Sequence, residues 1–254
     1  MKNDRTHDQA ILPPARAPNW RSLWPHASSY LTRSAPCPYL PHRQERKLVV
    51  PLAAQDAARQ YQNLSAQGFR RSQTLAWIPA CEHCSACRAL RIVASEFRLK
   101  AHWRRLHARN QQLRCGRAAG STQEQFDLLH MYLGARHAAS QMTQLQRRDY
   151  DAMTAPTSLQ TDILEYRQAG RLVGVMLRDR LAHGASLVYS FFDPALAAHS
   201  LGSWMILHNV LAMQAEQRSY VYLGHWIEGC KSMAYKTRWT PYEILTQDGW
   251  QRHG

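Results

Sequence analysis

The chain is poor in acidic residues and has no long apolar segment. Among its 254 residues, 18 Asp and Glu stand against 32 Lys and Arg, which gives a formal charge of +14. A surplus of this size is typical of proteins that bind polyanions, although it also occurs in proteins without such a partner. No apolar run approaches the length of a membrane-spanning helix, and none follows the charged N-terminus. We therefore expect a cytoplasmic protein with no membrane partner.

Cysteine is scarce, and four of the six copies are spaced like metal ligands. In a reducing compartment such residues are more often ligands or buried thiols than disulfides. Cys81, Cys84 and Cys87 form two overlapping CxxC turns, and Cys37 lies 44 residues upstream. Four thiolates complete a tetrahedral site. The sequence therefore predicts one metal centre made by these four cysteines.

Two other interpretations of the cysteines are small buried hydrophobic residues and a redox pair. The charged and polar neighbours Glu82, His83, Ser85 and Arg88 make a poor environment for core cysteines, so we favour metal binding. Zinc and an iron–sulfur cluster both accept four thiolates, and the spacing does not choose between them.

Composition and periodicity divide the chain into a lead-in and two parts. Residues 1–28 are rich in Pro, Arg and Ala and are predicted to be a mobile lead-in. Residues 29–103 are predicted to form a small cysteine-rich α+β module, with strands near 47–50, 74–78 and 90–93 and a helix over 53–67. Residues 104–254 are predicted to form the larger domain.

The larger domain begins with helical patterns and becomes strand-rich. A helix is predicted over 123–134, followed by strands over 159–168, 171–181 and 186–192, a helix over 201–217 and a strand over 220–223. A basic run over 99–117 precedes them, with Trp103 among its cations. This run fits a solvated helix face and a nucleic-acid contact equally well.

The segment from Leu187 to Leu223 has the order strand, Ser-Leu-Gly turn, helix, strand. This order resembles the acyl-donor element of the GNAT acyltransferases, whose glycine turn offers backbone N–H groups to the pyrophosphate of coenzyme A. The predicted fold class is therefore α+β, with a GNAT-like acyltransferase domain preceded by the small cysteine-rich α+β module. His199 stands where Arg or Gln is usual, and we expect the bulky Trp204 to obstruct coenzyme A.

Several short motifs are spread over roughly residues 30–250. They are Cys37-Pro-Tyr-Leu40, Gly68-Phe-Arg-Arg-Ser72, Cys81-x-x-Cys84-x-Ala-Cys87-x-x-x-Arg91, Arg136-His137, Tyr189-Ser-Phe-Phe-Asp193-Pro, Ser200-Leu-Gly202 and Tyr222-Leu-Gly-His-Trp-Ile227 through Met233-Ala-Tyr-Lys236. Together these motifs resemble the aminoacyl-tRNA–protein transferases, and most closely the short bacterial forms that transfer leucine.

The resemblance implies an enzyme that moves leucine from leucyl-tRNA to the α-amine of proteins with N-terminal Asp or Glu, marking them for degradation. The α-amine attacks the activated ester that joins leucine to the tRNA. Because its pKa is near 8, roughly a tenth of the amine is free at pH 7, so positioning and a proton acceptor suffice. No cofactor is implied for catalysis. Arginyl transfer by the same mechanism is the alternative within the family.

The resemblance also implies roles for particular residues. Backbone donors near Tyr189 and Ser190 would hold the developing oxyanion, and Asp193 or Tyr189 would take a proton or orient the ammonium. Asp193 before Pro194 is equally typical of a turn or helix cap. An acceptor carboxylate calls for Arg or Lys. By motif position the substrate-binding residues are Arg70, Arg71, Arg91, Arg136, Gly202 and Lys236.

Two functions from other classes remain open at the level of sequence. A non-catalytic, metal-stapled RNA-binding module explains the cysteines and the charge but leaves the strand–turn–helix–strand element without a purpose. A coenzyme A-dependent protein acetyltransferase is disfavoured by Trp204. For tRNA, we expect a steeply salt-dependent affinity with contacts spread over Arg98, Lys100, Arg104, Arg105 and Arg109.

Overall fold

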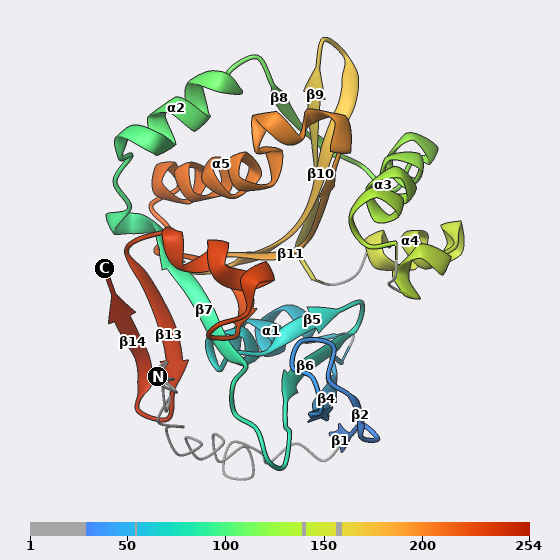
Figure 1. The fold of residues 1–254 in the computed structure, drawn as a ribbon, viewed down its shortest axis with the longest axis vertical. Helices are drawn as coiled ribbons and strands as arrows, with labels where there is room; N and C mark the ends of the chain where they lie inside the picture. The colour runs from blue at the N-terminus through green and yellow to red at the C-terminus, as the bar shows by residue number, and fades with distance from the viewer. Residues whose placement is uncertain (1–28, 54, 139–140, 156–158) are drawn as a thin grey trace, which may run out of the picture.

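The computed structural model describes residues 29–53, 55–138, 141–155 and 159–254 (Figure 1). The predicted lead-in, residues 1–28, lies outside the described residues. The described residues form a four-stranded sheet, an eight-stranded sheet and a two-stranded ribbon, with helices packed against them. This arrangement confirms the predicted α+β class. Within the described residues, no helix combines the length and the apolar character that a membrane span requires.

The four-stranded sheet and one helix build the N-terminal region. The strand order is β1 (Tyr30–Leu31), β4 (Lys47–Pro51), β6 (Leu75–Pro79), β5 (Arg70–Ser72). Helix α1 (Ala57–Ala66) covers the sheet and buries Tyr61 and Leu64 against Leu48, Val50 and Ala76. The chain then leaves the helix through Gly68, whose φ of 89° favours glycine. The ribbon of β2 (Ala35–Pro36) and β3 (Gln44–Glu45) carries Cys37 in its connection.

The eight-stranded sheet forms the body of the molecule. Its order is β14 (Gly249–His253), β13 (Tyr242–Thr246), β7 (Arg88–Val93), β12 (Tyr220–Trp226), β11 (Gly184–Phe192), β10 (Arg171–Leu181), β9 (Thr161–Gln168), β8 (Arg114–Ala118). Only β11 and β12 run parallel within these described pairs. Strand β7 belongs to this sheet, although its residues fall within the predicted N-terminal module.

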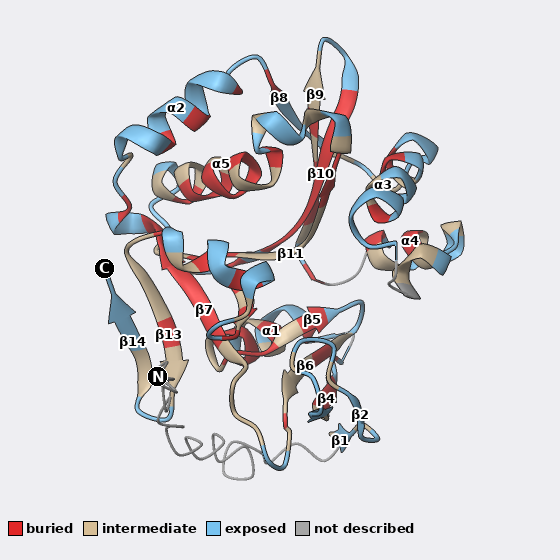
Figure 2. Cartoon of the chain, in the orientation of Figure 1, coloured by how far each residue is buried: buried red, intermediate tan, exposed pale blue. Residues whose placement is uncertain are grey.

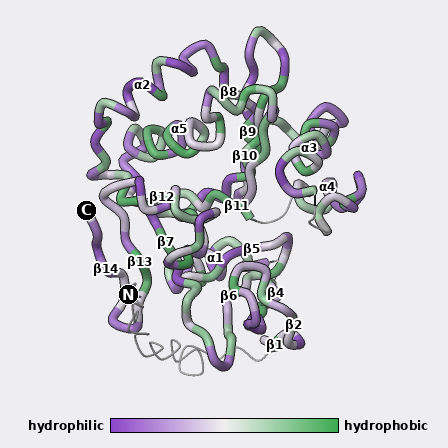
Figure 3. Tube along the Cα trace, in the orientation of Figure 1, coloured by the Kyte–Doolittle hydropathy of each residue, from purple (hydrophilic) through white to green (hydrophobic). Residues whose placement is uncertain are grey.

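Helices cover both faces of the large sheet, and residues of one strand alternate between them. Val175 and Phe191 pack with α3 (Gln123–Arg136) and α4 (Arg147–Thr154) on one face. Met176 packs with α5 (Leu201–Ala215) on the other. Helix α2 (Ala101–Arg109) lies over α5, so α5 is buried on two sides (Figure 2). Figure 3 shows the result: α5 is hydrophobic, whereas α2 is hydrophilic.

Short 3₁₀ segments connect these elements. They are η1 (Ala94–Glu96), η2 (Gln141–Gln144), η3 (Pro194–His199) and η4 (Lys231–Arg238). The capping box of Thr122 and Gln125 fixes the start of α3, because each residue bonds the backbone of the other.

Trp204 does not have the effect that we expected from the sequence. Its side chain is only 5% exposed and packs in the core, edge-on to Tyr166 and stacked on His208. The indole therefore points away from the surface at the start of α5 and leaves that surface open. The expectation that Trp204 obstructs coenzyme A was wrong, because sequence position alone did not say which side of α5 this residue occupies.

Candidate active site

A gap in the backbone pairing of the large sheet marks the candidate active site. Strands β11 and β12 pair only over Gly184–Ser186 and Tyr220–Tyr222. Both strands continue, to Phe192 and Trp226, without pairing to each other. A bulge between Tyr222 and Gly224 bends β12 at this point. The backbone groups along the gap are therefore not used for pairing between β11 and β12, although side chains donate to the carbonyls of Val188, Leu223 and His225.

Arg70 reaches into this gap from β5. Its Nη2 donates to the carbonyl oxygen of Val188 on β11 at 3.4 Å, and its guanidinium carbon lies 5.7 Å from the centre of the Trp77 ring. A Cβ atom at Gly224 on β12 would come within 2.6 Å of Arg70 Nε. Arg70 thus lies between the two strands. Within the described residues it has no carboxylate partner.

Lys236 of η4 lies at the β12 side of the gap. Its Nζ donates to the carbonyl oxygens of Leu223 and His225, at 2.9 and 2.5 Å. The residue is buried, and burial together with the nearby charge of Arg70 lowers its pKa to about 7. A neutral amine still has two N–H donors for these two carbonyls, and its lone pair is then free. The amine can therefore exchange a proton near pH 7.

His225 stays neutral in this neighbourhood. It is buried, and burial, Arg70 and Lys236 all hold its pKa well below the usual value. Its Nε2 lies 3.2 Å from the carbonyl oxygen of Gly68, which fits a neutral ring that donates from that nitrogen. The ring contributes packing beside Trp77 rather than charge.

Two tyrosine side chains lie near Arg70 at the gap: Tyr39 lines the same cavity, and Tyr235 feels the charge of Arg70. Burial raises the pKa of the Tyr235 phenol, and the positive charge of Arg70 opposes that rise. Tyr132 and Tyr39 raise the same pKa further. Burial of Tyr235 is only partial, since it is 38% exposed and Tyr39 is 46% exposed. Aromatic faces next to a cation can hold a base or a peptide side chain by stacking. Both tyrosines lie within the motif segments Cys37-Pro-Tyr-Leu40 and Met233-Ala-Tyr-Lys236, but the sequence analysis gave them no role, since a single aromatic residue carries no spacing signal.

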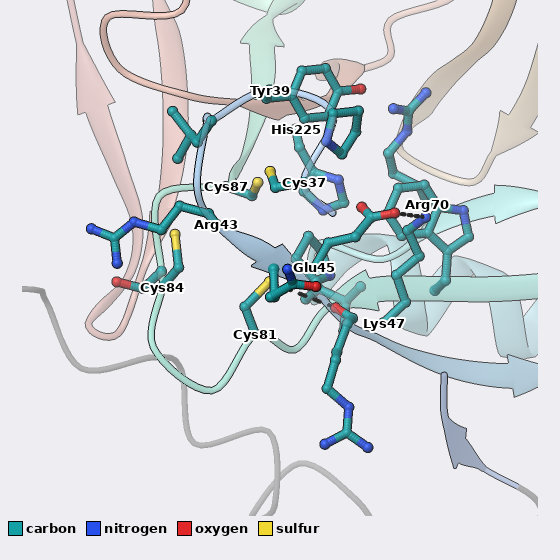
Figure 4. A pocket seen from close by; sticks show the side chains of 18 of the residues that line it. Cys37, Tyr39, Arg43, Glu45, Lys47, Arg70, Cys81, Cys84, Cys87 and His225 are labelled. Atoms are coloured by element: carbon teal, nitrogen blue, oxygen red, sulfur yellow. Dashed lines mark hydrogen bonds and ion pairs between the residues drawn. The ribbon is translucent and has the colours of Figure 1, made fainter. Parts of the chain in front are cut away.

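The four predicted metal ligands line one cavity of about 220 Å³ next to Arg70 (Figure 4). Burial, and then the thiols of Cys81, Cys37 and Cys84, raise the pKa of Cys87 to about 12. The structure therefore brings together residues separated by up to 50 positions in the sequence. In the described part of the chain, no three His, Cys, Asp or Glu side chains already converge on one ion position. Arg70, Trp77 and His225 line the same cavity, so the thiols and the gap are neighbours.

Arg71 and Arg91 are already paired with carboxylates. Arg71 is buried, and its Nε and Nη2 each lie 2.7 Å from an oxygen of Asp179. Arg91 forms an ion pair with Glu243. Its guanidinium carbon lies 3.6 Å from the centre of the Tyr220 ring and 4.0 Å from the centre of the Trp250 ring. These contacts fix the N-terminal region and β13–β14 to the sheet. An acceptor carboxylate that bound Arg71 or Arg91 would have to displace Asp179 or Glu243. The role of these two arginines in acceptor binding stays a prediction.

The predicted catalytic residues lie on or just after β11. Tyr189 and Ser190 lie on the part of β11 that does not pair with β12, and burial raises the pKa of Tyr189, so its phenol stays protonated. The Tyr189 hydroxyl donates to Met142 Sδ at 3.9 Å. Asp193 accepts from Ala195 N at 2.9 Å and from Arg171 Nη1 at 2.6 Å, and it is 2% exposed. The cap that the sequence also allowed for Asp193 is present.

The remaining predicted residues flank the start of α5. Gly202 lies in the first turn, where a Cβ atom would come within 3.0 Å of the Phe192 ring. Arg136, at the end of α3, is exposed, with its guanidinium carbon 5.6 Å from the centre of the same ring. Glycine thus allows the helix to pack closely on β11, and Arg136 lies near the same ring.

Comparison with known proteins identifies the family of this chain. The family models described as "Arginine-tRNA-protein transferase, N terminus" and "Arginine-tRNA-protein transferase, C terminus" match residues 35–105 and 124–246. A protein named "Aspartate/glutamate leucyltransferase" from Parvibaculum lavamentivorans is 43% identical over 88% of this chain and 94% of its own length. The protein of the same name from Phenylobacterium zucineum is 44% identical, over 87% of this chain and 89% of its own.

One solved structure that resembles the fold is the C-terminal domain (DUF2156) of a putative lysylphosphatidylglycerol synthetase from Agrobacterium fabrum. It covers 61% of this chain and 50% of that chain, with 12% sequence identity and a TM-score of 0.43, which is too distant to support a conclusion about function. The two family models and the long alignments are decisive. The chain belongs to the arginine-tRNA–protein transferase family and is a transferase enzyme.

Proposed function

We propose that this enzyme transfers leucine from leucyl-tRNA to the α-amine of proteins that begin with Asp or Glu. The observation that carries the proposal is Arg70, a cation without a carboxylate partner among the described residues, at the unpaired edges of β11 and β12. A guanidinium in this position suits a carboxylate side chain. The names of the relatives support both the acceptor and leucine as the donated residue. The family name supports arginyl transfer as the second candidate.

The larger domain supplies the GNAT-like framework that we propose for this reaction. Strand β11, helix α5 and parallel strand β12 follow one another, and the two strands separate after three pairs. The donor ester would enter this gap and the acceptor would bind beside Arg70. The cysteine-rich region would supply one wall.

In the proposed reaction the α-amine nitrogen attacks the ester carbonyl carbon. The bond from that carbon to the ribose oxygen breaks, an amide bond forms, and the proton lost by the amine is balanced by the proton gained by the ribose oxygen. Backbone N–H groups near Tyr189 and Ser190 would stabilise the oxyanion. Lys236, with a pKa near 7, is better suited to accept a proton than to bind a carboxylate, whereas the protonated Tyr189 is suited to donate one.

Acceptor choice tests the proposal directly. Purified protein is incubated with leucyl-tRNA and peptides that differ only in their first residue. Asp and Glu peptides are expected to react about 30-fold faster or more than Asn and Gln peptides, because the amides leave Arg70 uncompensated, a difference of about 2 kcal/mol or more. Arginyl-tRNA in a parallel reaction decides which residue is donated. Equal rates with Asp and Asn would refute the carboxylate pocket.

We also propose that Cys37, Cys81, Cys84 and Cys87 hold a structural zinc ion or iron–sulfur cluster. The donor set fits, because four thiols line one cavity and zinc and iron both bind thiolates. The group would fix the loop from Cys81 to Cys87 against the ribbon that carries Cys37. No catalytic step is assigned to it.

Elemental analysis and absorbance of anaerobically purified protein test the metal centre and distinguish zinc from an iron–sulfur cluster. Cys84→Ser is expected to lose bound metal and thermal stability, since metal binding contributes folding free energy. Cys115→Ser is the matched control, because Cys115 is exposed and lies outside the cavity. A metal-free, fully active protein that is indifferent to Cys84→Ser would rule the centre out.

The proposed location is the cytoplasm, where aminoacyl-tRNA is present. The same peptide assay tests two alternative functions from other classes. A non-catalytic RNA-binding module would bind tRNA and leave every peptide unchanged. An acetyltransferase would modify the peptide only when acetyl coenzyme A is supplied.

A further inference from the structure

A second pocket, of about 250 Å³, lies where α2, the start of α5 and η4 meet. We call it the α5 pocket. Its lining is cationic: it contains no Asp or Glu, and its polar side chains include Arg105, Arg109, Ser200, Ser203, Tyr235 and Arg238. A cavity with several guanidinium groups and no carboxylate has an unbalanced positive charge. Such a cavity is built for an anion.

The hydrogen-bond donors of the α5 pocket are largely unused. Within the described residues, Arg105 and Arg238 form no ion pair, and the donation from Arg109 Nη1 goes to the carbonyl oxygen of Ala198 at 2.9 Å. Trp239 lines the pocket at 1% exposure, and its indole N–H has no acceptor among the described residues. A buried donor without a partner is unfavourable unless a ligand supplies the acceptor.

The backbone also contributes positive charge to the α5 pocket. Helix α5 has 15 residues, no acidic residue in its first turn and no side-chain cap. The N–H groups of its first turn therefore lack partners within the helix and carry a partial positive charge. Asn110 holds the approach to this turn, because its Nδ2 donates to the carbonyl oxygen of His199 at 3.0 Å. The pocket thus combines cationic side chains with fixed backbone donors.

The α5 pocket is next to the candidate active site. Tyr235 lines the pocket, and the charge of Arg70 in the β11–β12 gap acts on the same phenol. The next residue, Lys236, bonds β12 at the gap. A donor whose ester lies in the gap would therefore place the phosphate of the attached nucleotide toward this pocket. Between residues 97 and 123 the chain has seven Lys and Arg and no Asp or Glu, so α2 extends the positive surface outward.

We propose that the α5 pocket binds the last phosphodiester at the 3′ end of the donor RNA, and so fixes the esterified ribose at the gap. This inference rests on the proposed function. Arginine suits the role because its planar guanidinium group can donate to two phosphate oxygens at once. The contact differs from the general attraction between tRNA and the basic surface, since it concerns one phosphate and particular side chains.

The test uses the full-length protein and a leucylated RNA minihelix whose last phosphodiester is replaced by an uncharged methylphosphonate. For the wild type, this replacement is expected to reduce the rate of transfer to an Asp peptide about tenfold or more. Arg105→Gln and Arg238→Gln are expected to lower the rate with normal RNA to a similar degree. With the modified RNA, the variants should then match the wild type, because the partner of each arginine is already gone.

Arg104→Gln is the matched control, since Arg104 is a neighbouring cation of α2 outside the pocket lining. Its effect should be the same with normal and modified RNA. Independent, additive effects of the methylphosphonate and the Arg105 and Arg238 substitutions would overturn the inference. Thermal unfolding of each variant detects misfolding. Lysine replacements keep the charge but not the bidentate guanidinium, so they are expected to recover part of the rate.

Failure of the inference is distinguishable from failure of the proposed function. If the wild type does not leucylate the Asp peptide with normal RNA, the proposed function fails. If it does, and the coupling is absent, only the phosphate assignment fails. The phosphates of coenzyme A are the other source of the same chemistry. Acetylation of the peptide from acetyl coenzyme A, lost in Arg105→Gln, would assign the pocket to that donor and overturn the inference.

Discussion

Arg70 and Arg71 are adjacent in the sequence but have opposite surroundings. Successive residues of a strand point to opposite sides. Arg71 therefore faces the interior, where Asp179 and Thr161 take up its donors. Arg70 faces the β11–β12 gap and bonds only a carbonyl among the described hydrogen bonds. One arginine is suited to hold the protein together, and the other to bind a substrate.

We predict that Arg70→Gln and Arg71→Gln separate catalysis from stability. Arg70→Gln should reduce transfer to Asp peptides about 30-fold while leaving tRNA affinity and the melting temperature nearly unchanged. Arg71→Gln should lower the free energy of unfolding by about 3 to 5 kcal/mol, because Asp179 is left buried without its partner. Peptide kinetics and urea unfolding of both variants measure this. A stable, inactive Arg71→Gln would contradict the assignment.

A second prediction concerns Lys236, which faces Arg70, His225, Cys230 and Cys87. The folded protein lowers its pKa from 10.5 to about 7. Between these values the unfolded chain binds more protons, so this residue makes stability rise with pH across that window and imposes its full penalty below it. Urea unfolding at about pH 7 and about pH 9 should show a smaller rise in Lys236→Met than in the wild type. Identical pH dependences would exclude the buried ammonium.

At the scale of residues, the sequence was informative where spacing or a motif carried the signal. All four cysteines predicted as ligands line one cavity, and Arg70 and Lys236 lie at the gap. The α5 pocket and the two tyrosines near Arg70 depend on side chains from distant elements. Their juxtaposition has no local pattern, so only the fold reveals it.

At the scale of elements, the place of Arg70 between β11 and β12 depends on Gly224. Its φ of 74° is in the left-handed region, and Arg70 occupies the space where a side chain would begin. Gly229 has a similar φ of 75°, but a Cβ atom there would meet no atom within 4 Å among the described residues. Replacing either glycine by alanine would therefore introduce the same backbone strain, but only the replacement at Gly224 would also clash with Arg70.

We therefore predict that Gly224→Ala reduces transfer by about tenfold or more, whereas Gly229→Ala loses about 1 kcal/mol of stability and retains activity. The difference between the variants isolates the displacement of Arg70 from the strain of the backbone. Initial rates and urea unfolding of both proteins give the comparison. Equal loss of activity in the two variants would mean that strain alone explains the effect.

Most long elements follow from periodicity, whereas short ones do not. The helices predicted over 123–134 and 201–217 appear as α3 and α5, and the strands predicted over 159–168 and 171–181 appear as β9 and β10. The two-residue strands β1, β2 and β3 are too short for a pattern. Strand β8 was not predicted within the basic run, because four of its five residues are exposed and its sequence has no alternation of apolar and polar residues.

For the whole molecule, the positive charge is concentrated on α2 and its continuation. Reversing Arg98, Lys100, Arg104 and Arg109 together should weaken tRNA binding and flatten its dependence on salt, because fewer counterions are released. Reversing Arg33, Arg59, Arg148 and Arg218, four exposed cations outside α2, is the control for the same change in net charge. Binding measured across a salt series reports the slope. An unchanged slope in the α2 variant would show that this face is only solvated.

The place of β7 has a consequence for how this protein is made. Residues 88–93 pair with β12 and β13, which lie about 130 to 150 positions later in the chain. Trp250 also bonds Ala66 of α1, so the last strand secures one of the first helices. The large sheet cannot close until the C-terminus has left the ribosome, and the slow step of folding should come after synthesis. Nascent chains that stop before residue 242 should remain sensitive to protease throughout, even in segments already complete.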